Sequence, residues 1–249
     1  MKIIRTVVTV IVIAVNFIVL TPWMLWCRSQ HRKNTPESRA KCEALAPKLI
    51  SYMTGCVMKL SGSTFDIIGE ENIPDRPCVL VGNHQSYFEV IGLLAYSDKM
   101  GSYLAKTGIG KIPFLGPWME TIDCVFIDRG NARQGMQAIK EATEKVKLGC
   151  TMHIFPEGTR SKDGQIGEFN PGALMIATRT KVPVVPFLVD GARSIFEDNG
   201  NLLGPGKASV TFFPPIETEG LTREEINSLN NRVRDFLIEE QKKLREAEE

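Results

Sequence analysis

The sequence predicts an α/β fold, with a central, mostly parallel sheet flanked by helices and an N-terminal membrane-associated helical hairpin. Residues 6–27 form an apolar run without charge, which predicts the first helix of the hairpin. From residue 64 onward, short apolar segments alternate with helical patterns, as expected for a sheet with crossover helices. Polar stretches follow several of the apolar segments. We therefore expect anchoring helices in residues 1–60 and an α/β domain in residues 61–249.

The apolar run, "TVVTVIVIAVNFIVLTPWMLWC", has 22 residues. A helix of that length spans roughly 30 Å, the thickness of a bilayer's hydrocarbon core. Trp23 and Trp26 lie near its end, where indole rings favour the membrane interface. A cleaved signal peptide fits poorly, because the run is long and no small-residue cleavage site follows it. A second helix is expected from about Thr35 to Leu60, packed on the core or facing the membrane.

Basic residues flank the apolar run on both sides: Lys2, Arg5, Arg28, Arg32 and Lys33. The larger cluster follows the run, so the rest of the chain is expected at the cytoplasmic face of the membrane. Flanking charge on both sides suits equally a helix that dips into one leaflet and bends at Pro22. The sequence leaves both arrangements open.

Composition excludes several classes of function. The 249 residues include 30 Lys and Arg against 29 Asp and Glu, and a general nucleic-acid binder would carry a clear basic excess. Six scattered cysteines form no C-x-x-C pair, which indicates reduced thiols and a cytosolic catalytic portion. Zinc needs clustered Cys and His ligands, and none are clustered here. No metal or cofactor is expected.

The body from residue 64 reads as strands joined by helices. Short apolar runs predict strands at residues 78–82, 102–106, 124–129, 151–155, 182–189 and 208–213. Residues 89–97 are predicted helical, Asn131 caps a helix that runs to Leu148, and Pro171 begins a helix that ends near Thr180. Thr222 and Glu225 form a capping box for a charged C-terminal helix.

In such sheets ligands gather at the carboxyl ends of the strands. Four polar stretches fall at predicted strand ends: Asn83–His84, Asp128–Arg129, the loop from Pro156, and the loop after Leu104 with Lys106 and Lys111. Their convergence predicts a single site.

His84 precedes Glu89 by five residues. Positions five apart on a helix diverge by about 140° around its axis, so the pair meets only if His84 lies just outside the helix. A carboxylate on one imidazole nitrogen fixes the tautomer and leaves the other nitrogen to accept a proton. The alternative is a structural histidine near a helix start, which spacing alone favours. His153 lies mid-strand and is expected in the core.

"FPEGTRS", residues 155–161, contains Pro156 and Gly158, which force a turn. Arg160 offers a planar donor fork that matches a phosphate group. Glu157 is expected to position Arg160 or to accept from a substrate hydroxyl. Alternatively, the stretch is a polar surface turn. Arg129 is either a second phosphate ligand or the ion-pair partner of Asp128.

Taken in order, these motifs resemble the glycerolipid acyltransferase family, specifically its 1-acyl-glycerol-3-phosphate acyltransferases. That family shows Asn-His-x4-Asp, a basic segment, Phe-x-x-Arg, Phe-Pro-Glu-Gly-Thr-Arg-Ser and a Val-Pro-rich strand. This chain shows "NHQSYFE", "AKTGIGKIPFLG", "FIDR", "FPEGTRS" and "VPVVPF". The resemblance covers roughly residues 78–190, and the seven-residue motif is its most specific part.

The resemblance implies transfer of a fatty acyl chain from an acyl carrier protein or coenzyme A thioester to the sn-2 hydroxyl of lysophosphatidic acid, giving phosphatidic acid at a membrane. His84 then corresponds to the general base and Glu89 to its orienting acid. The resemblance assigns acceptor binding to residues of the later motifs: Arg129, Glu157, Gly158, Thr159 and Arg160. Lys106 is expected to assist them. A thioester is already reactive, so neither a covalent enzyme intermediate nor a metal is needed.

Two positions depart from the family pattern. Glu89 stands where the family usually has Asp, and the extra methylene moves the carboxylate by about 1.5 Å. Asn170 stands where relatives often carry Lys. Two alternatives remain: a related acyltransferase with another acceptor, such as glycerol-3-phosphate or another lysolipid, and a non-catalytic phospholipid-binding module.

Overall fold

The computed structural model describes residues 1–99 and 101–248. Within that range, strands form a seven-stranded sheet in the order β1-β7-β6-β2-β5-β3-β4. Neighbouring strands pair in parallel except β6 and β7, which are antiparallel. The strands are β1 (Thr64–Ile68), β2 (Val79–Gly82), β3 (Ser102–Lys106), β4 (Val125–Ile127), β5 (Met152–Ile154), β6 (Val184–Asp190) and β7 (Lys207–Phe212).

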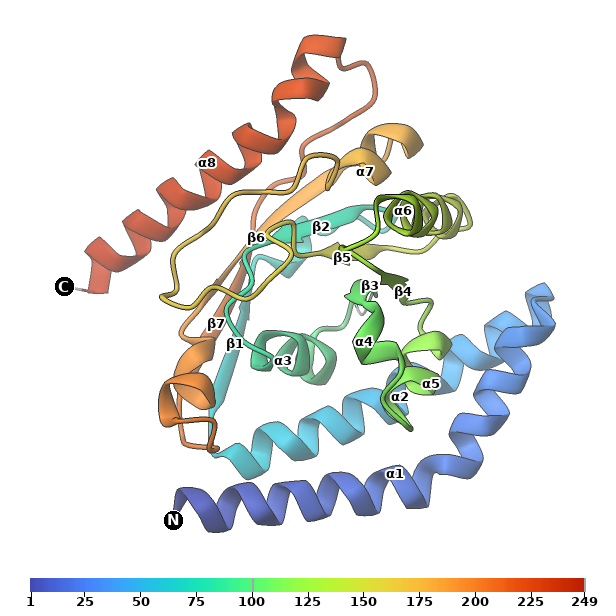
Figure 1. Cartoon of the computed structure of the whole chain (residues 1–249), viewed down its shortest axis with the longest axis vertical. Coiled ribbons are helices and arrows are strands. Elements are labelled where there is room, and N and C mark those ends of the chain that lie inside the picture. The colour runs from blue at the N-terminus through green and yellow to red at the C-terminus, as the bar shows by residue number, and fades with distance from the viewer. Residues whose placement is uncertain (100, 249) are drawn as a thin grey trace.

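Helices cover both faces of this sheet (Figure 1). The α-helices are α1 (Lys2–Lys33), α2 (Pro36–Ser61), α3 (Phe88–Tyr96), α4 (Thr107–Gly110), α5 (Leu115–Thr121), α6 (Ala132–Lys147), α7 (Met175–Thr180) and α8 (Arg223–Glu248). One buried cluster joins α2 and α3 to the sheet through residues such as Met58 and Leu93. A second cluster joins α6 and α8 to the opposite face through residues such as Ala142 and Val233. The predicted α/β fold with its flanking helices is confirmed.

Local sequence signals account for where the helices begin. The Asn131 side chain accepts a hydrogen bond from the Gln134 amide at 3.1 Å, so the predicted cap of α6 is confirmed. The capping box before α8 is also confirmed, because the Glu225 carboxylate accepts from the Thr222 amide and the Thr222 hydroxyl accepts from the Glu225 amide.

Strand β1 was not among the predicted strands, and several helical features also differ from the expectation. Residues 171–174 form turns, and α7 begins only at Met175, so the helix expected from Pro171 is shorter. The short helices α4 and α5 lie between β3 and β4. Two 3₁₀ segments, Ala192–Ile195 and Glu197–Asn199, follow β6. All these segments are too short to show a helical repeat in the sequence.

The N-terminal hairpin consists of α1 and α2, which lie side by side below the sheet in Figure 1. Pro22 lies inside α1, and the helix bends in its second half, as expected for a residue that removes a backbone donor. Thr9, Met24 and Cys27 are its only buried residues, and most of its large apolar side chains face outward. Among the described residues, α1 is the one helix long and apolar enough to cross a membrane.

Both ends of α1 are bonded to the rest of the protein. Near its start, the Thr6 hydroxyl accepts from the Leu203 amide at 2.8 Å. The Arg5 guanidinium donates to the Ser61 carbonyl at the end of α2, also at 2.8 Å. Near its end, Arg28 forms an ion pair with Glu120 of α5 at 2.7 Å. The helix therefore lies along the body of the protein over its whole length.

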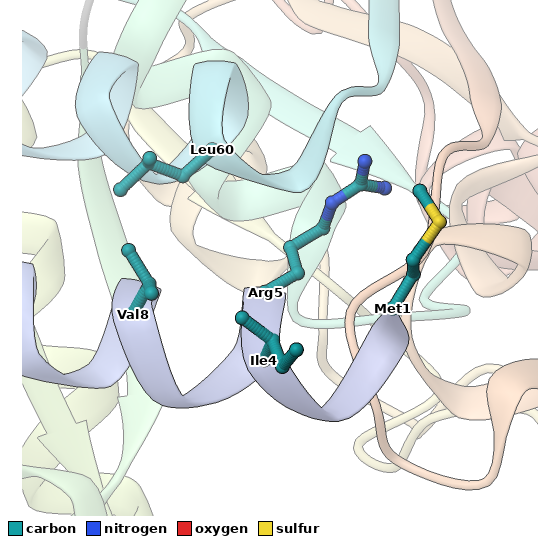
Figure 2. A pocket seen from close by; sticks show the side chains of 5 residues that line it. All are labelled: Met1, Ile4, Arg5, Val8 and Leu60. Carbon is teal, nitrogen blue, oxygen red and sulfur yellow. The ribbon is translucent and has the colours of Figure 1, made fainter.

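A cavity of about 310 Å³ opens between the start of α1 and the end of α2 (Figure 2). The apolar side chains that line it are Met1, Ile4, Val8 and Leu60. The stem of Arg5 also lines it, and the Arg5 guanidinium points toward the end of α2. The Arg5 bond to the Ser61 carbonyl satisfies a group that the end of the helix leaves free. We interpret this contact as a brace of the hairpin.

Candidate active site

The four polar stretches lie at one edge of the sheet. β2 pairs with β5 in parallel, with Val81 opposite Ile154, and β5 pairs with β3 in the same sense. β3 pairs with β4, with Lys106 opposite Ile127. Because parallel strands end at the same edge, the residues that follow these four strands are brought together there.

His84 and Glu89 are in contact. α3 begins only at Phe88, so His84 lies outside the helix on the turn after β2. Its Nδ1 bonds to Oε1 of Glu89, in the first turn of α3. The His84 side chain is 19% exposed and the Glu89 side chain is 0% exposed. The arrangement required for a general-base pair is present, with Nε2 as the nitrogen that Glu89 does not engage.

The Glu89 carboxylate also organises the turn that carries His84. Its Oε2 accepts from the Ser86 amide at 2.7 Å and from the Gln85 amide at 3.0 Å. Burial raises the pKa of Glu89, while the His84 ring and these amides act in the opposite direction. The longer side chain of Glu, compared with the family's usual Asp, reaches His84 and both amides.

The 155–161 loop encloses His84. The Phe155 ring stacks on the imidazole with centroids 4.3 Å apart. The Ser161 amide donates to the His84 carbonyl at 2.7 Å, and the His84 amide donates to Glu157 Oε1 at 3.0 Å. The backbone of His84 is therefore held on both sides by this motif.

One of the two expectations for Glu157 was that it positions Arg160. Within the described residues, Glu157 forms no hydrogen bond or ion pair with Arg160, so this expectation is wrong. Its second oxygen accepts from the Gly167 amide at 3.0 Å, so both carboxylate oxygens bind backbone amides. Burial raises the pKa of Glu157, and the two amides oppose that shift. Contact with a substrate hydroxyl stays a prediction.

Arg160 is held by a residue that the sequence did not single out. Its Nη1 donates to Glu197 Oε1 at 2.6 Å. Its guanidinium carbon lies 3.7 Å from the centre of the Tyr87 ring, a cation–π contact. Arg160 is thus fixed beside the His84 turn, with an exposed fraction of 31% for its side chain.

Arg129 lies against Gly158. A Cβ at Gly158 would come within 3.2 Å of Arg129 Nη1 and 2.6 Å of Asn170 Nδ2. Gly158 has φ +77°, a conformation that favours glycine, so this residue suits both the turn and the approach of Arg129. Asp128 accepts from the Gly130 amide at 3.0 Å, and within the described ranges no ion pair joins it to Arg129.

The remaining predicted residues lie at the same edge. Lys106 ends β3 and is exposed, and Lys111 follows α4. Thr159 is exposed on the loop between Gly158 and Arg160. Asn170 Nδ2 donates to the Pro156 carbonyl at 2.8 Å, so the residue that replaces the family's usual Lys braces the loop.

Three residues of the site received no role from sequence reasoning, although Asn83 was placed at this edge together with His84. The Asn83 side chain accepts from the Val189 amide at 2.7 Å and donates to the Val189 carbonyl at 3.0 Å, which ties the end of β2 to β6. Its place beside His84 was a usable signal. Tyr87 lies within the same motif. Glu197 lies 111 positions after Ser86, to which it bonds, and no spacing rule connects them.

This geometry can perform one kind of chemistry. An imidazole oriented by a buried carboxylate can take a proton from a bound hydroxyl. Guanidinium groups at the same edge can hold an anionic group of the molecule that carries this hydroxyl. A base that activates an alcohol beside cationic groups suits group transfer to a phosphorylated acceptor.

Comparison with known proteins agrees with this chemistry. The family model described as Acyltransferase matches residues 64–190, about half of the chain. The chloroplastic 1-acyl-sn-glycerol-3-phosphate acyltransferase BAT2 of Brassica napus is 40% identical over 154 residues, which are 61% of this chain and 44% of that protein. The 1-acyl-sn-glycerol-3-phosphate acyltransferase of Pseudomonas aeruginosa is 31% identical over 181 residues, 72% of this chain and 70% of that one.

The fold has a close counterpart among solved structures. The crystal structure of the 1-acyl-sn-glycerophosphate (LPA) acyltransferase PlsC from Thermotoga maritima matches with a TM-score of 0.78 and 27% identity over 98% of both chains. The chain spans 44% of the Brassica protein and 63% of the 1-acyl-sn-glycerol-3-phosphate acyltransferase of Saccharomyces cerevisiae. The matched segment contains the His84–Glu89 pair and the 155–161 loop, and the chain belongs to the acyltransferase family.

Proposed function

We propose that the protein is a 1-acylglycerol-3-phosphate O-acyltransferase, which moves a fatty acyl group from a thioester to the sn-2 hydroxyl of lysophosphatidic acid and yields phosphatidic acid. The observation that carries the proposal is the bond between His84 and buried Glu89, on a turn that the 155–161 loop encloses. The relatives from Brassica napus and Pseudomonas aeruginosa carry the name of this activity.

In the proposed reaction His84 is the general base. Nδ1 is bonded to Glu89, so Nε2 takes the proton of the acceptor hydroxyl while its oxygen attacks the thioester carbonyl. The carbon–sulfur bond of the resulting tetrahedral intermediate then breaks, and the imidazolium returns the proton to the leaving thiolate. Glu89 stabilises the imidazolium between these two steps. A base of this kind contributes roughly 10²–10⁴ in rate.

Acceptor binding is assigned to the cationic groups at the sheet edge. Arg160 and Arg129 provide planar donors for the phosphate, and Lys106 provides a point charge at the end of β3. Thr159 supplies a backbone amide of a tight turn, which also suits an anion. Gly158, whose own amide donates to the Phe155 carbonyl at 3.1 Å, lets Arg129 approach this turn. Glycerol-3-phosphate shares the phosphate, so it is the second candidate acceptor that these residues favour.

The donor is proposed to be a fatty acyl thioester of acyl carrier protein or coenzyme A. Both present the same reacting group to His84. The thiol that leaves is the same phosphopantetheine sulfhydryl in either case, so the chemistry at the sheet edge does not depend on the carrier. The two donors are therefore separated by assay.

We further propose that residues 1–60 anchor the α/β domain of residues 61–249 to the cytoplasmic face of a membrane. The outward-facing apolar side chains of α1 support this, because a surface helix that lacks a polar outer face suits lipid. Bonds from both ends of α1 to the body favour a helix lying in one leaflet over a spanning helix. A spanning helix would carry one of its ends to the other side.

The proposed function is tested by release of free thiol from an acyl thioester. Purified full-length protein in mixed micelles is given palmitoyl-coenzyme A or palmitoyl-acyl carrier protein, with lysophosphatidic acid, glycerol-3-phosphate or lysophosphatidylcholine as acceptor. Thiol release that needs lysophosphatidic acid, with phosphatidic acid as product, is expected. Release with glycerol-3-phosphate alone would transfer the proposal to that acceptor, and no release with any pair would leave only a lipid-binding module.

A further inference from the structure

Glu197 lies outside every motif and outside the segment matched by the family model, yet it contacts two of the motifs. Its Oε1 accepts from Arg160 Nη1 at 2.6 Å and its Oε2 accepts from the Ser86 hydroxyl at 2.6 Å. The Tyr87 amide donates to Oε1 at 3.3 Å. The Glu197 side chain is only 11% exposed, so these groups replace most of its contact with water.

The turn from His84 to Tyr87 therefore lies between two carboxylates. Glu89 accepts the Ser86 amide at 2.7 Å, and Glu197 accepts the Ser86 hydroxyl. Glu89 orients the imidazole, and Glu197 holds the guanidinium of Arg160 over the Tyr87 ring. One short turn thus fixes the group proposed to take the proton and a group proposed to bind the phosphate.

We propose that Glu197 is a positioning residue, which holds Arg160 in the orientation that receives the acceptor's phosphate next to His84. This inference rests on the proposed function. Arg160 has a long side chain with several rotatable bonds, and ordering it on binding costs free energy that a preformed contact avoids. The ion pair uses Nη1 of the fork, which leaves the other guanidinium nitrogens for an anion.

A purely structural role for Glu197 makes a different prediction. If Glu197 only stabilised the turn, its loss would disturb His84 as much as Arg160, and both substrates would be affected. A positioning role acts through Arg160 alone. Loss of Glu197 should then raise the acceptor KM and leave the thioester KM unchanged. This effect should disappear once Arg160 has been removed.

The test is a double-mutant cycle in the full-length protein with Glu197→Gln, Arg160→Ala and the double variant. The amide of Gln is uncharged and places a donor where one carboxylate oxygen accepts. We expect Glu197→Gln to raise the lysophosphatidic acid KM about tenfold, with kcat changed less than threefold and the thioester KM unchanged. In the Arg160→Ala background, Glu197→Gln is expected to add nothing to the acceptor KM.

Binding is measured separately from turnover. A lysophosphatidic acid analogue that lacks the sn-2 hydroxyl cannot be acylated, and its Kd in mixed micelles is expected to follow the same pattern as the KM. If the wild type binds this analogue but releases no thiol when given lysophosphatidic acid itself, the proposed function fails, and the Kd values still decide the role of Glu197. If the wild type does not bind the analogue, the positioning role is overturned.

One further variant serves as a control, and another tests the second contact of Arg160. Glu217→Gln removes a carboxylate paired with Arg76 before β2, at the opposite edge of the sheet, and should change no constant. Tyr87→Leu removes the ring beneath Arg160 from a side chain that is already 48% exposed, and should raise the acceptor KM about threefold. If Glu197→Gln does not fold, Glu197→Asp takes its place in the cycle, because it keeps the charge and withdraws the carboxylate from Arg160. Additive losses in the cycle, equal rises in both KM values, or tighter acceptor binding in Glu197→Gln would each overturn the proposal.

Discussion

The imidazole of His84 bonds through Nδ1 to Glu89, although His84 lies outside the helix that carries the glutamate. The carboxylate has no exposed surface and also accepts the amides of Gln85 and Ser86. Glu89 therefore sets both the orientation of the ring and the shape of the turn that presents it. The imidazole proposed to take the proton is therefore already oriented before any substrate binds.

Replacing Glu89 by Gln should lower kcat by about 10² or more, because the amide does not stabilise the imidazolium and can present a donor to Nδ1. The KM values should change little, since Glu89 is buried behind His84. Steady-state kinetics measures this, with circular dichroism to establish that the variant is folded. A folded variant with kcat within threefold of wild type would contradict the orienting role.

Replacing Gly158 by Ala should destabilise the 155–161 loop and weaken acceptor binding. The new Cβ would meet Asn170 Nδ2 at 2.6 Å and Arg129 Nη1 at 3.2 Å, in a backbone with φ +77°. Gly220→Ala is the matched control, since it has φ +82° with nothing within 4 Å. Both variants should lose about 1 kcal/mol of unfolding free energy to backbone strain. Only Gly158→Ala should also raise the acceptor KM, and equal KM values in the two would refute this reading.

His153 should make the stability of the protein depend on pH. The residue is 2% exposed and stacks on Tyr103 at 4.5 Å, and burial lowers its pKa to about 4. An unfolded histidine titrates near 6.5, so the folded state disfavours the proton. The stabilisation is present above pH 6.5 and is lost as pH falls from there toward 4, by about 3 kcal/mol in total.

His153→Phe keeps a ring at this position without a titrating group. The free energy of unfolding, measured with denaturant between pH 7 and pH 4, should fall less steeply with decreasing pH for this variant than for the wild type. Both the wild type and the variant retain the buried carboxylates Glu89 and Glu157, so the effects of these groups cancel in the comparison. Parallel curves for the two proteins would show that His153 does not contribute to the pH dependence.

Membrane binding should depend on the outer face of α1. Ile11 and Ile18 are seven residues apart, 56% and 68% exposed, and burial of each in lipid contributes roughly 1.5–3 kcal/mol. The double change to Glu should lower co-sedimentation with phospholipid vesicles at least tenfold. Ile238→Glu on α8, at a side chain that is 37% exposed, is the control and should bind like the wild type. Equal loss in both would argue against α1 as the membrane-facing element.

Sequence patterns predicted most of the fold because the relevant signals are local. The buried strands β2 and β6 appear as short apolar runs, and Asn131 and Thr222 mark helix starts through bonds to residues three positions away. The helices α4 and α5 lack such signals. Their positions depend on contacts with α1, α2 and the neighbouring strands.

The candidate site was predicted only in part, for a physical reason. His84, Glu89 and the 155–161 loop follow strand ends, so the rule for parallel sheets brought them together. The partner of Arg160 is Glu197, on a short 3₁₀ segment after β6. A carboxylate there has no local pattern to identify it, because its role arises from the crossing of distant segments.

His84 is proposed to take the proton of the acceptor hydroxyl, and the decisive measurement is the thiol-release rate of His84→Ala. The measurement uses saturating palmitoyl thioester and lysophosphatidic acid, with the binding of the acceptor analogue that lacks the sn-2 hydroxyl measured alongside. We expect kcat to fall by about 10²–10⁴ while the variant remains folded and binds the analogue. A folded His84→Ala protein that releases thiol at the wild-type rate would contradict this proposal.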